Sequence, residues 1–173
     1  SSTRTFSSTG ASNVDDANRP LILTLEGNIG AGKSTLLQIL RGPLNAEIVT
    51  EPVDVWRSVG GNPDCNLLDL FYKDPKRWGY TFQSYAFYSR LQSWVAGHEA
   101  DARDGSNSSH VRKPLRVYER SVYSDRHVFA INTHRGGLMN DTEWAVYEEW
   151  YSWLVNRFGS RVDGLIYMRT DPE

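Results

Sequence analysis

The stretch that decides the fold consists of Gly27, Asn28, Ile29, Gly30, Ala31, Gly32, Lys33, Ser34 and Thr35. It fits the pattern G-x-x-x-x-G-K-[S/T] and follows an apolar run, residues 21–25, that predicts a buried strand. The glycines let successive N–H groups point at one anion, while Lys33 reaches the β- and γ-phosphates and Ser34 places its hydroxyl on Mg²⁺. A helix beginning near Lys33 directs its positive dipole end at the same phosphates. The sequence therefore predicts a nucleotide-binding loop, and not a glycine-rich turn without a ligand.

Apolar runs alternate with helical stretches along the rest of the chain. The expected strands are residues 21–26, 47–50, 115–118 and 164–169, and the expected helices are residues 33–40, 66–72, 78–97, 121–132 and 142–158. This alternation predicts an α/β fold, a parallel sheet flanked by helices on both faces, with ligands at the carboxyl ends of the strands. The polar stretch 97–114 is expected to be a mobile surface loop without chemistry.

Composition excludes several kinds of partner. The 173 residues suit one domain, and the net charge of −2 gives no basic field that would hold a nucleic acid. Cys65 is the single cysteine, so the sequence has no intrachain disulfide and no multi-cysteine zinc site. No apolar run approaches the roughly 18 residues of a membrane span. We therefore expect neither a nucleic-acid partner nor a membrane partner. We expect an intracellular location, because a single cysteine suits a reducing compartment.

The two ends of the chain carry further expectations. Residues 1–13 are rich in Ser and Thr and contain Arg4 but no acid, a composition typical of a mitochondrial transit peptide. We expect residues 1–19 to be a disordered tail or a transit-peptide remnant, which favours the mitochondrial matrix over the cytoplasm. Residues 20–173 are expected to form one domain without its C-terminal part, because the chain stops directly after the apolar run 165–168.

Charged residues follow two of the expected strands. Glu51 closes the second strand, and Pro52 after it is expected to keep the backbone extended and to prevent a helix from starting. Glu119 and Arg120 close the third strand and place an acid for Mg²⁺-bound water and a guanidinium for phosphate charge at one edge. A lone Glu is usually a solvated strand end, but two acids beside a phosphate loop favour a function.

The helix from Trp78 is rich in aromatic side chains and carries Gln83, Ala86 and Arg90 near one face. The Gln83 amide, placed among aromatic rings, could hydrogen-bond to the polar edge of a heterocycle that lies between those rings. Ordinary core packing is the alternative for some of these rings. Asp125 is placed to pair with Arg90, either beside that heterocycle or as a surface ion pair worth little.

Several segments together resemble the deoxyribonucleoside kinase family. They are EGNIGAGKST, TEPVDVW, LLDLFYKDPKRW, TFQSYAFYSR, YERSVYSDR and NDTEWAVYEEW, in the family's order and spacing. The chain looks most like the deoxycytidine and deoxyguanosine kinase branch, with the mitochondrial thymidine kinase branch more distant. The resemblance runs from about residue 22 to residue 173 and implies a P-loop kinase fold whose lid, sugar-binding acid and adenine-binding loop lie beyond Glu173. A chain that lacks them is expected to turn over little.

The resemblance implies that ATP or another nucleoside triphosphate phosphorylates the 5′-hydroxyl of a deoxyribonucleoside in nucleotide salvage, with Mg²⁺. The implied catalytic residues are Glu51 as general base, Arg120 as the positioning group and Lys33. Ser34 and, through water, Glu119 would hold the metal. The implied substrate-binding residues are Glu51, Trp56, Tyr72, Phe82, Gln83, Ala86, Arg90, Arg120, Asp125 and Phe129. Among them, Tyr72 would meet the 3′-hydroxyl, Gln83 the base edge and Trp56, Phe82 and Phe129 the ring faces. An Arg90–Asp125 pair would occupy the space of a thymine methyl, which favours deoxycytidine or purine deoxynucleosides over thymidine.

Helix 142–158 indicates self-association. Its apolar stripe consists of Trp144, Tyr147, Tyr151, Leu154 and Phe158, while Trp150 and Trp153 lie off it. More of its surface is apolar than one core contact needs, and the resemblance implies a homodimer through helices 121–132 and 142–158.

Other functions share the phosphate loop. A GTPase needs Asp-x-x-Gly and Asn-Lys-x-Asp signals, and the sequence contains neither. A P-loop nucleoside monophosphate kinase would place extra cations, and not Glu51, beside its acceptor phosphate. A non-catalytic nucleotide-binding fragment would need no acceptor site. The last two stay open as alternatives.

Overall fold

The computed structural model describes residues 20–104, 115–158 and 161–170. Its sheet is 4-stranded and parallel, in the order β2-β3-β1-β4. The strands are β1 (Leu21–Gly27), β2 (Glu47–Val49), β3 (Leu115–Glu119) and β4 (Gly164–Met168). The helices are α1 (Lys33–Arg41), α2 (Val53–Arg57), η2 (Val59–Gly61), α3 (Leu67–Lys73), α4 (Pro75–Asp104), α5 (Val122–Ser124), the π-helical η3 (Asp125–Ala130), α6 (Ile131–Arg135) and α7 (Asp141–Phe158). The predicted α/β class is confirmed.

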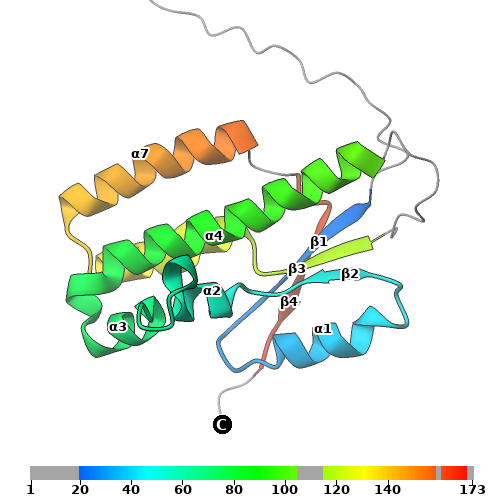
Figure 1. The fold of residues 1–173 in the computed structure, drawn as a ribbon, viewed down its shortest axis with the longest axis horizontal. Helices are drawn as coiled ribbons and strands as arrows, with labels where there is room; N and C mark the ends of the chain where they lie inside the picture. Colours follow the sequence, from blue (N-terminus) through cyan, green and yellow to red (C-terminus); the bar gives the residue numbers. More distant parts are fainter. Residues whose placement is uncertain (1–19, 105–114, 159–160, 171–173) are drawn as a thin grey trace, which may run out of the picture.

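Helices cover both faces of the sheet, as Figure 1 shows, with α1 on one side of the strands and α4 and α7 on the other. Successive strand residues point to opposite faces, so each strand contributes to both layers. Leu25 and Val117 pack with Leu37 of α1. Ile22 and Tyr118 join the core beneath α4 and α7.

The sheet brings the predicted chemistry to one edge. β1 pairs with β3 so that Leu25 lies opposite Glu119. The phosphate loop, which follows β1, and the turn after β3 therefore begin at the same level. β2 ends at Val49, which places Glu51 just beyond the same carboxyl edge.

The prediction that Pro52 prevents a helix was wrong. α2 begins at Val53, directly after Pro52. A proline is tolerated there because the first N–H groups of a helix have no partner within it. This short helix buries Trp56, which is 5 % exposed.

The expected loop 97–114 is helical in its first part, because α4 continues to Asp104. Arg116 of β3 explains the extension. Its buried guanidinium donates to the Asp101 carboxylate at 2.8 and 2.9 Å and to Glu47 at 2.8 Å, which ties the last turns of α4 to the sheet. The rest of that loop lies outside the described residues, as do residues 1–19 with the predicted tail.

The expected helix 121–132 is divided into α5, η3 and α6 and continues to Arg135. Within α7, Tyr147 and Tyr151 are buried as the apolar stripe predicts, whereas Phe158 is 42 % exposed. Trp150 was wrongly placed off the packed face, because its ring meets Phe87 of α4 with centroids 5.0 Å apart. None of the described helices combines the length and the apolar character of a membrane span.

Candidate active site

The phosphate loop curls tightly between β1 and α1. Gly30 and Gly32 have φ angles of 79° and 82°, a region that favours glycine. Gly27 is needed for space, because a Cβ there would lie 2.7 Å from the carbonyl oxygen of Met168 on β4. The N–H groups at the start of α1 lie at this loop, where an anion would complete their hydrogen bonding.

Lys33 lies within the loop. Its Nζ donates to the carbonyl oxygens of Gly27 and Asn28 at 3.2 and 2.8 Å. Burial lowers the pKa of Lys33 below its ordinary value, Arg120 adds to that effect, and Glu119 and other nearby carboxylates oppose it. The ammonium is thus positioned at the point where the sequence places donor phosphates.

Ser34 and Glu119 meet beside the loop. The Ser34 hydroxyl donates to Glu119 Oε1 at 2.9 Å. Both groups offer the hard oxygen atoms that Mg²⁺ prefers. The residues present therefore fit a magnesium site.

Arg120 has a φ of 66°, which strains a residue other than glycine. Hydrogen bonds on both sides hold the strained turn. The Arg120 N–H donates to the Leu25 carbonyl at 3.0 Å, and the Ser121 N–H donates to Glu26 Oε1 at 2.8 Å. Sequence reasoning missed Glu26, because a carboxylate at the end of a buried strand gives no sign of the distant N–H that it accepts.

The Arg120 guanidinium lies beside Phe129 and Glu51. Its Cζ lies 4.6 Å from the centroid of the Phe129 ring. Its Nε lies 3.4 Å from Glu51 Oε1. Glu119 and Arg120 are neighbours in the chain but have different side-chain partners, Ser34 for Glu119 and Glu51 with Phe129 for Arg120.

A buried ion network centres on Arg90. Its Nη2 donates to Glu51 Oε1 at 2.9 Å, its Nε to Asp125 Oδ2 at 2.8 Å. The Arg90 and Asp125 side chains are 4 % and 2 % exposed, so the predicted pair is confirmed and a surface ion pair is excluded. Burial raises the pKa of Asp125 to about 6, against the opposing effect of Arg90. Burial lowers the pKa of Arg90, but Asp125 and Glu51 outweigh it and keep that pKa above its ordinary value.

A cavity of about 400 Å³ opens beside this network. Every residue predicted to bind the substrate lines it: Glu51, Trp56, Tyr72, Phe82, Gln83, Ala86, Arg90, Arg120, Asp125 and Phe129. Phe82 meets Phe71 face to face, with centroids 4.6 Å apart, and Trp56 edge-on at 5.4 Å. The size of this cavity and its aromatic lining with a few polar groups are typical of a site for a small molecule.

Sequence reasoning missed part of this lining. The additional residues are Ile29, which the sequence assigned only to the phosphate loop, and Val53, Leu68, Phe71, Asn132, Thr133 and Leu138. Thr133 lies one helical turn after Phe129, and Phe71 precedes Tyr72, so spacing from predicted wall residues was a usable signal. Val53 belongs to α2, which the sequence did not predict.

A second cavity, of about 330 Å³, lies at the phosphate loop. Its lining is Ile29, Gly30, Gly32, Lys33, Ser34, Thr35, Glu51, Glu119 and Arg120. Ile29, Glu51 and Arg120 line both cavities. A molecule in the aromatic cavity and an anion at the loop would therefore meet at a carboxylate and a guanidinium.

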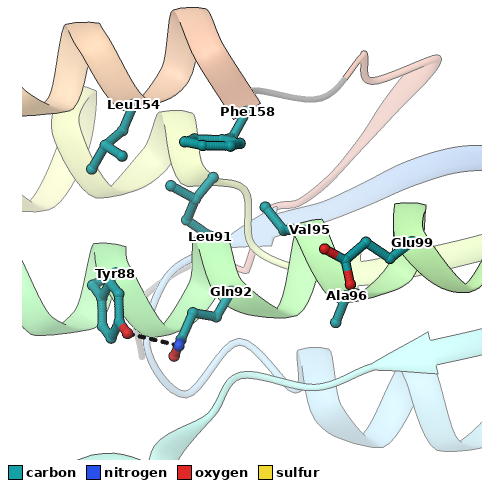
Figure 2. Close-up of a pocket in the computed structure, with 8 residues that line it drawn as sticks. All are labelled: Tyr88, Leu91, Gln92, Val95, Ala96, Glu99, Leu154 and Phe158. Carbon is teal, nitrogen blue, oxygen red and sulfur yellow. Dashed lines mark hydrogen bonds between the residues drawn. The ribbon is translucent and has the colours of Figure 1, made fainter.

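A third cavity, of about 440 Å³, lies between α4 and α7. Figure 2 shows Leu91, Leu154 and Phe158 lining it from the two helices, with Gln92 donating to the Tyr88 hydroxyl at 2.8 Å. It lies apart from the phosphate loop and shares no lining residue with the other two cavities among the described residues.

Known proteins are similar to this chain over most of its length. The family model described as deoxynucleoside kinase matches residues 23–173. Deoxycytidine kinase 2 of Gallus gallus is 40% identical over 166 residues, which cover 87% of this chain and 60% of that protein. Deoxycytidine kinase of Bos taurus is 40% identical, with 87% of this chain and 62% of that protein covered. Mitochondrial deoxyguanosine kinase of Xenopus laevis is 37% identical over 164 residues, with 87% and 60% covered. The chain thus spans about 60% of the length of these relatives.

Proposed function

The chain belongs to the deoxynucleoside kinase family, and on that premise we propose that the protein transfers the γ-phosphate of ATP, or of another nucleoside triphosphate, to the 5′-hydroxyl of a deoxyribonucleoside. One observation carries the proposal. Glu51 and Arg120 stand on the wall between the phosphate-loop cavity and the aromatic cavity. Donor and acceptor would meet there with a base and a cation already in place.

The aromatic cavity binds the acceptor. Trp56, Phe82 and Phe129 enclose the base, and the Gln83 amide reads its hydrogen-bonding edge. Tyr72, at the exposed rim, meets the 3′-hydroxyl of the sugar. This arrangement directs the 5′-hydroxyl toward Glu51.

Glu51 accepts the proton of the 5′-hydroxyl as that oxygen bonds to the γ-phosphorus and the bond to the β-phosphate oxygen breaks. Arg120 holds the Glu51 carboxylate and stabilises charge on the transferring group, and Lys33 does so from the donor side. Mg²⁺ held by Ser34 and, through water, Glu119 would supply charge neutralisation of the phosphates.

The Arg90–Asp125 pair favours deoxycytidine or purine deoxynucleosides over thymidine. Both groups line the acceptor cavity and both are buried. A thymine methyl beside them would lose water without gaining apolar contact.

The charges of the acceptor cavity speak against a nucleoside monophosphate as acceptor. Its lining carries Arg90 and Arg120 as cations, and Glu51 and Asp125 as anions. These charges balance and are paired with one another, with Glu51 Oε1 2.9 Å from Arg90 and 3.4 Å from Arg120. The phosphate group of a nucleoside monophosphate would find no surplus cation among these four lining residues.

We also propose a homodimer through α7 and the neighbouring helices. Trp153 is 63 % exposed and Phe158 is 42 % exposed, next to the apolar cavity between α4 and α7. Val128 in η3 is 47 % exposed, so the other helical region expected at the interface also carries an exposed apolar side chain. For the location, the composition of residues 1–13 supports mitochondria, and the cytoplasm is the alternative.

The test is a phosphorylation assay on the protein expressed at the full length of its gene, with labelled ATP and Mg²⁺. The acceptors are the natural deoxynucleosides and, in parallel, the corresponding monophosphates. Labelled deoxynucleoside monophosphate is the expected product. Product only from the monophosphates would support the alternative kinase, and nucleotide binding without either product would support a non-catalytic module.

A further inference from the structure

The amide of Gln83 can meet a base in two ways, because its oxygen and nitrogen exchange places when it turns over. One orientation suits cytosine or adenine, which present a ring-nitrogen acceptor beside an exocyclic amino group. The other suits uracil, thymine, guanine or hypoxanthine, which present a ring N–H beside a carbonyl. An amide held in one orientation would therefore select between two classes of base.

Thr133 restricts this choice. Gln83 Nε2 donates to Thr133 Oγ1 at 3.2 Å, and that hydroxyl donates to the Phe129 carbonyl at 2.9 Å. A hydroxyl has one proton, so Thr133 faces Gln83 as an acceptor. Gln83 and Thr133 are 5 % and 6 % exposed, so water is a poor substitute for either partner. The NH₂ group must face Thr133, and Oε1 lies on the other side of the amide.

Helix packing fixes the distance that this contact needs. Gly79 lies one turn before Gln83 on α4, and a Cβ there would lie 3.0 Å from Thr133 Cγ2 and 2.7 Å from the Leu138 carbonyl oxygen. The glycine thus lets α6 pack closely against α4. A larger residue would push Thr133 away from the amide.

The π-helical η3 sets the direction of Thr133. On a regular α-helix, Asp125 and Thr133 would point about 80° apart, at 100° a residue. The π turn takes up an extra residue. Both side chains consequently reach α4, Asp125 at Arg90 and Thr133 at Gln83.

We propose that Thr133 is a specificity-determining positioning residue that locks the Gln83 amide and selects bases with a ring-nitrogen acceptor beside an exocyclic amino group. The inference rests on the proposed function and narrows its purines to those with the edge of adenine, because guanine presents a ring N–H beside a carbonyl. Asp125 lines the same cavity and adds a second acceptor. An exocyclic amino group can donate to Gln83 Oε1 and to this carboxylate, whereas an exocyclic carbonyl can donate to neither.

The test compares deoxycytidine with deoxyuridine, which differ in this edge but have the same ring and no methyl group. Steady-state kcat/KM is measured for both in the full-length protein and its Thr133→Val and Thr133→Ser variants. The wild type should prefer deoxycytidine. Thr133→Val keeps the shape of the side chain but removes the acceptor. It should lower the deoxycytidine-to-deoxyuridine ratio of kcat/KM about fivefold, which corresponds to the contribution of one ordinary hydrogen bond. Thr133→Ser should keep the wild-type ratio.

Ser89 on α4, the hydrogen-bond partner of Trp56, offers a matched control. Ser89 Oγ accepts from Trp56 Nε1 at 2.9 Å and donates to the Ala86 carbonyl at 3.0 Å. This is the hydrogen-bond pattern of Thr133, but the indole of Trp56 cannot exchange a donor for an acceptor as the Gln83 amide can. Ser89→Ala should change kcat/KM for deoxycytidine and for deoxyuridine by the same factor and leave their ratio unchanged. Thr133→Ala replaces Thr133→Val if the latter does not fold. If the wild type is active and the deoxycytidine-to-deoxyuridine ratio of kcat/KM is unchanged or rises in the hydroxyl-free variant, only the role of Thr133 is overturned. If the wild type phosphorylates no deoxynucleoside, the proposed function is overturned together with that role.

Discussion

Replacing Glu51 by Gln removes the proposed proton acceptor while keeping the side chain in place. Glu51 Oε1 receives Arg90 Nη2 at 2.9 Å and lies 3.4 Å from Arg120 Nε, and a glutamine oxygen can accept from both guanidinium groups. Deoxynucleoside affinity should therefore change little. Loss of general-base catalysis should lower kcat about 10²- to 10⁴-fold, a rise of about 3–5 kcal/mol in the barrier. Weaker hydrogen bonds to the guanidinium groups should cost about 1–2 kcal/mol of folding free energy.

Glu47→Gln is the matched control for this change. Glu47 lies at the other end of β2 and pairs with Arg116 at 2.8 Å. The Arg116 and Arg90 side chains are both 4 % exposed, so both variants neutralise a partner of an equally buried arginine. The control should lose folding free energy of the same order but keep the wild-type kcat.

Single-turnover quench measurements with saturating ATP isolate the chemical step. Thermal unfolding of both variants accounts for any loss of fold. A chemical rate in Glu51→Gln equal to the wild-type rate would refute the role of general base. An equal fall in the Glu47→Gln control would attribute the loss to stability and not to the proton acceptor.

Lys33→Ala should lower kcat/KM by several orders of magnitude in a variant that still folds, because charge on the transferring group loses its cation; near-normal turnover of a folded variant would remove the lysine from the mechanism. Replacing Arg90 by Met together with Asp125 by Ala should raise thymidine relative to deoxycytidine in kcat/KM, whereas Arg90→Met alone leaves the buried Asp125 carboxylate without its partner and costs about 3–5 kcal/mol of folding free energy. A double variant with an unmoved ratio would contradict that account of selectivity. Asp125 has a pKa raised from 3.8 to about 6, so the folded state holds its proton more tightly than the unfolded state and this contribution to stability is lost as pH rises through that range. Chemical denaturation should therefore show the stability of the wild type relative to Asp125→Asn falling by on the order of 3 kcal/mol over this range, and parallel pH profiles would count against the raised pKa.

The sequence by itself determined the phosphate loop, the parallel α/β class and the edge at which the site lies. Gly30 and Gly32 mark backbone conformations that other residues adopt only under strain, and their spacing to Lys33 and Ser34 is local. Apolar runs also report burial directly, so the strands that end next to Glu51 and at Glu119 could be placed from the chain to within a residue or two. The residues that the family resemblance implies for substrate binding lie around one cavity at this edge.

Only the tertiary structure decided how those residues are held. Glu26 accepts a distant N–H and thereby supports the strained turn at Arg120. The π turn of η3 and the close approach at Gly79 bring Thr133 to the Gln83 amide. Each of these contacts joins residues far apart in the chain and depends on where two elements pack. A local pattern reports the conformation of its own segment, but the partner of a buried polar group is chosen by packing between segments.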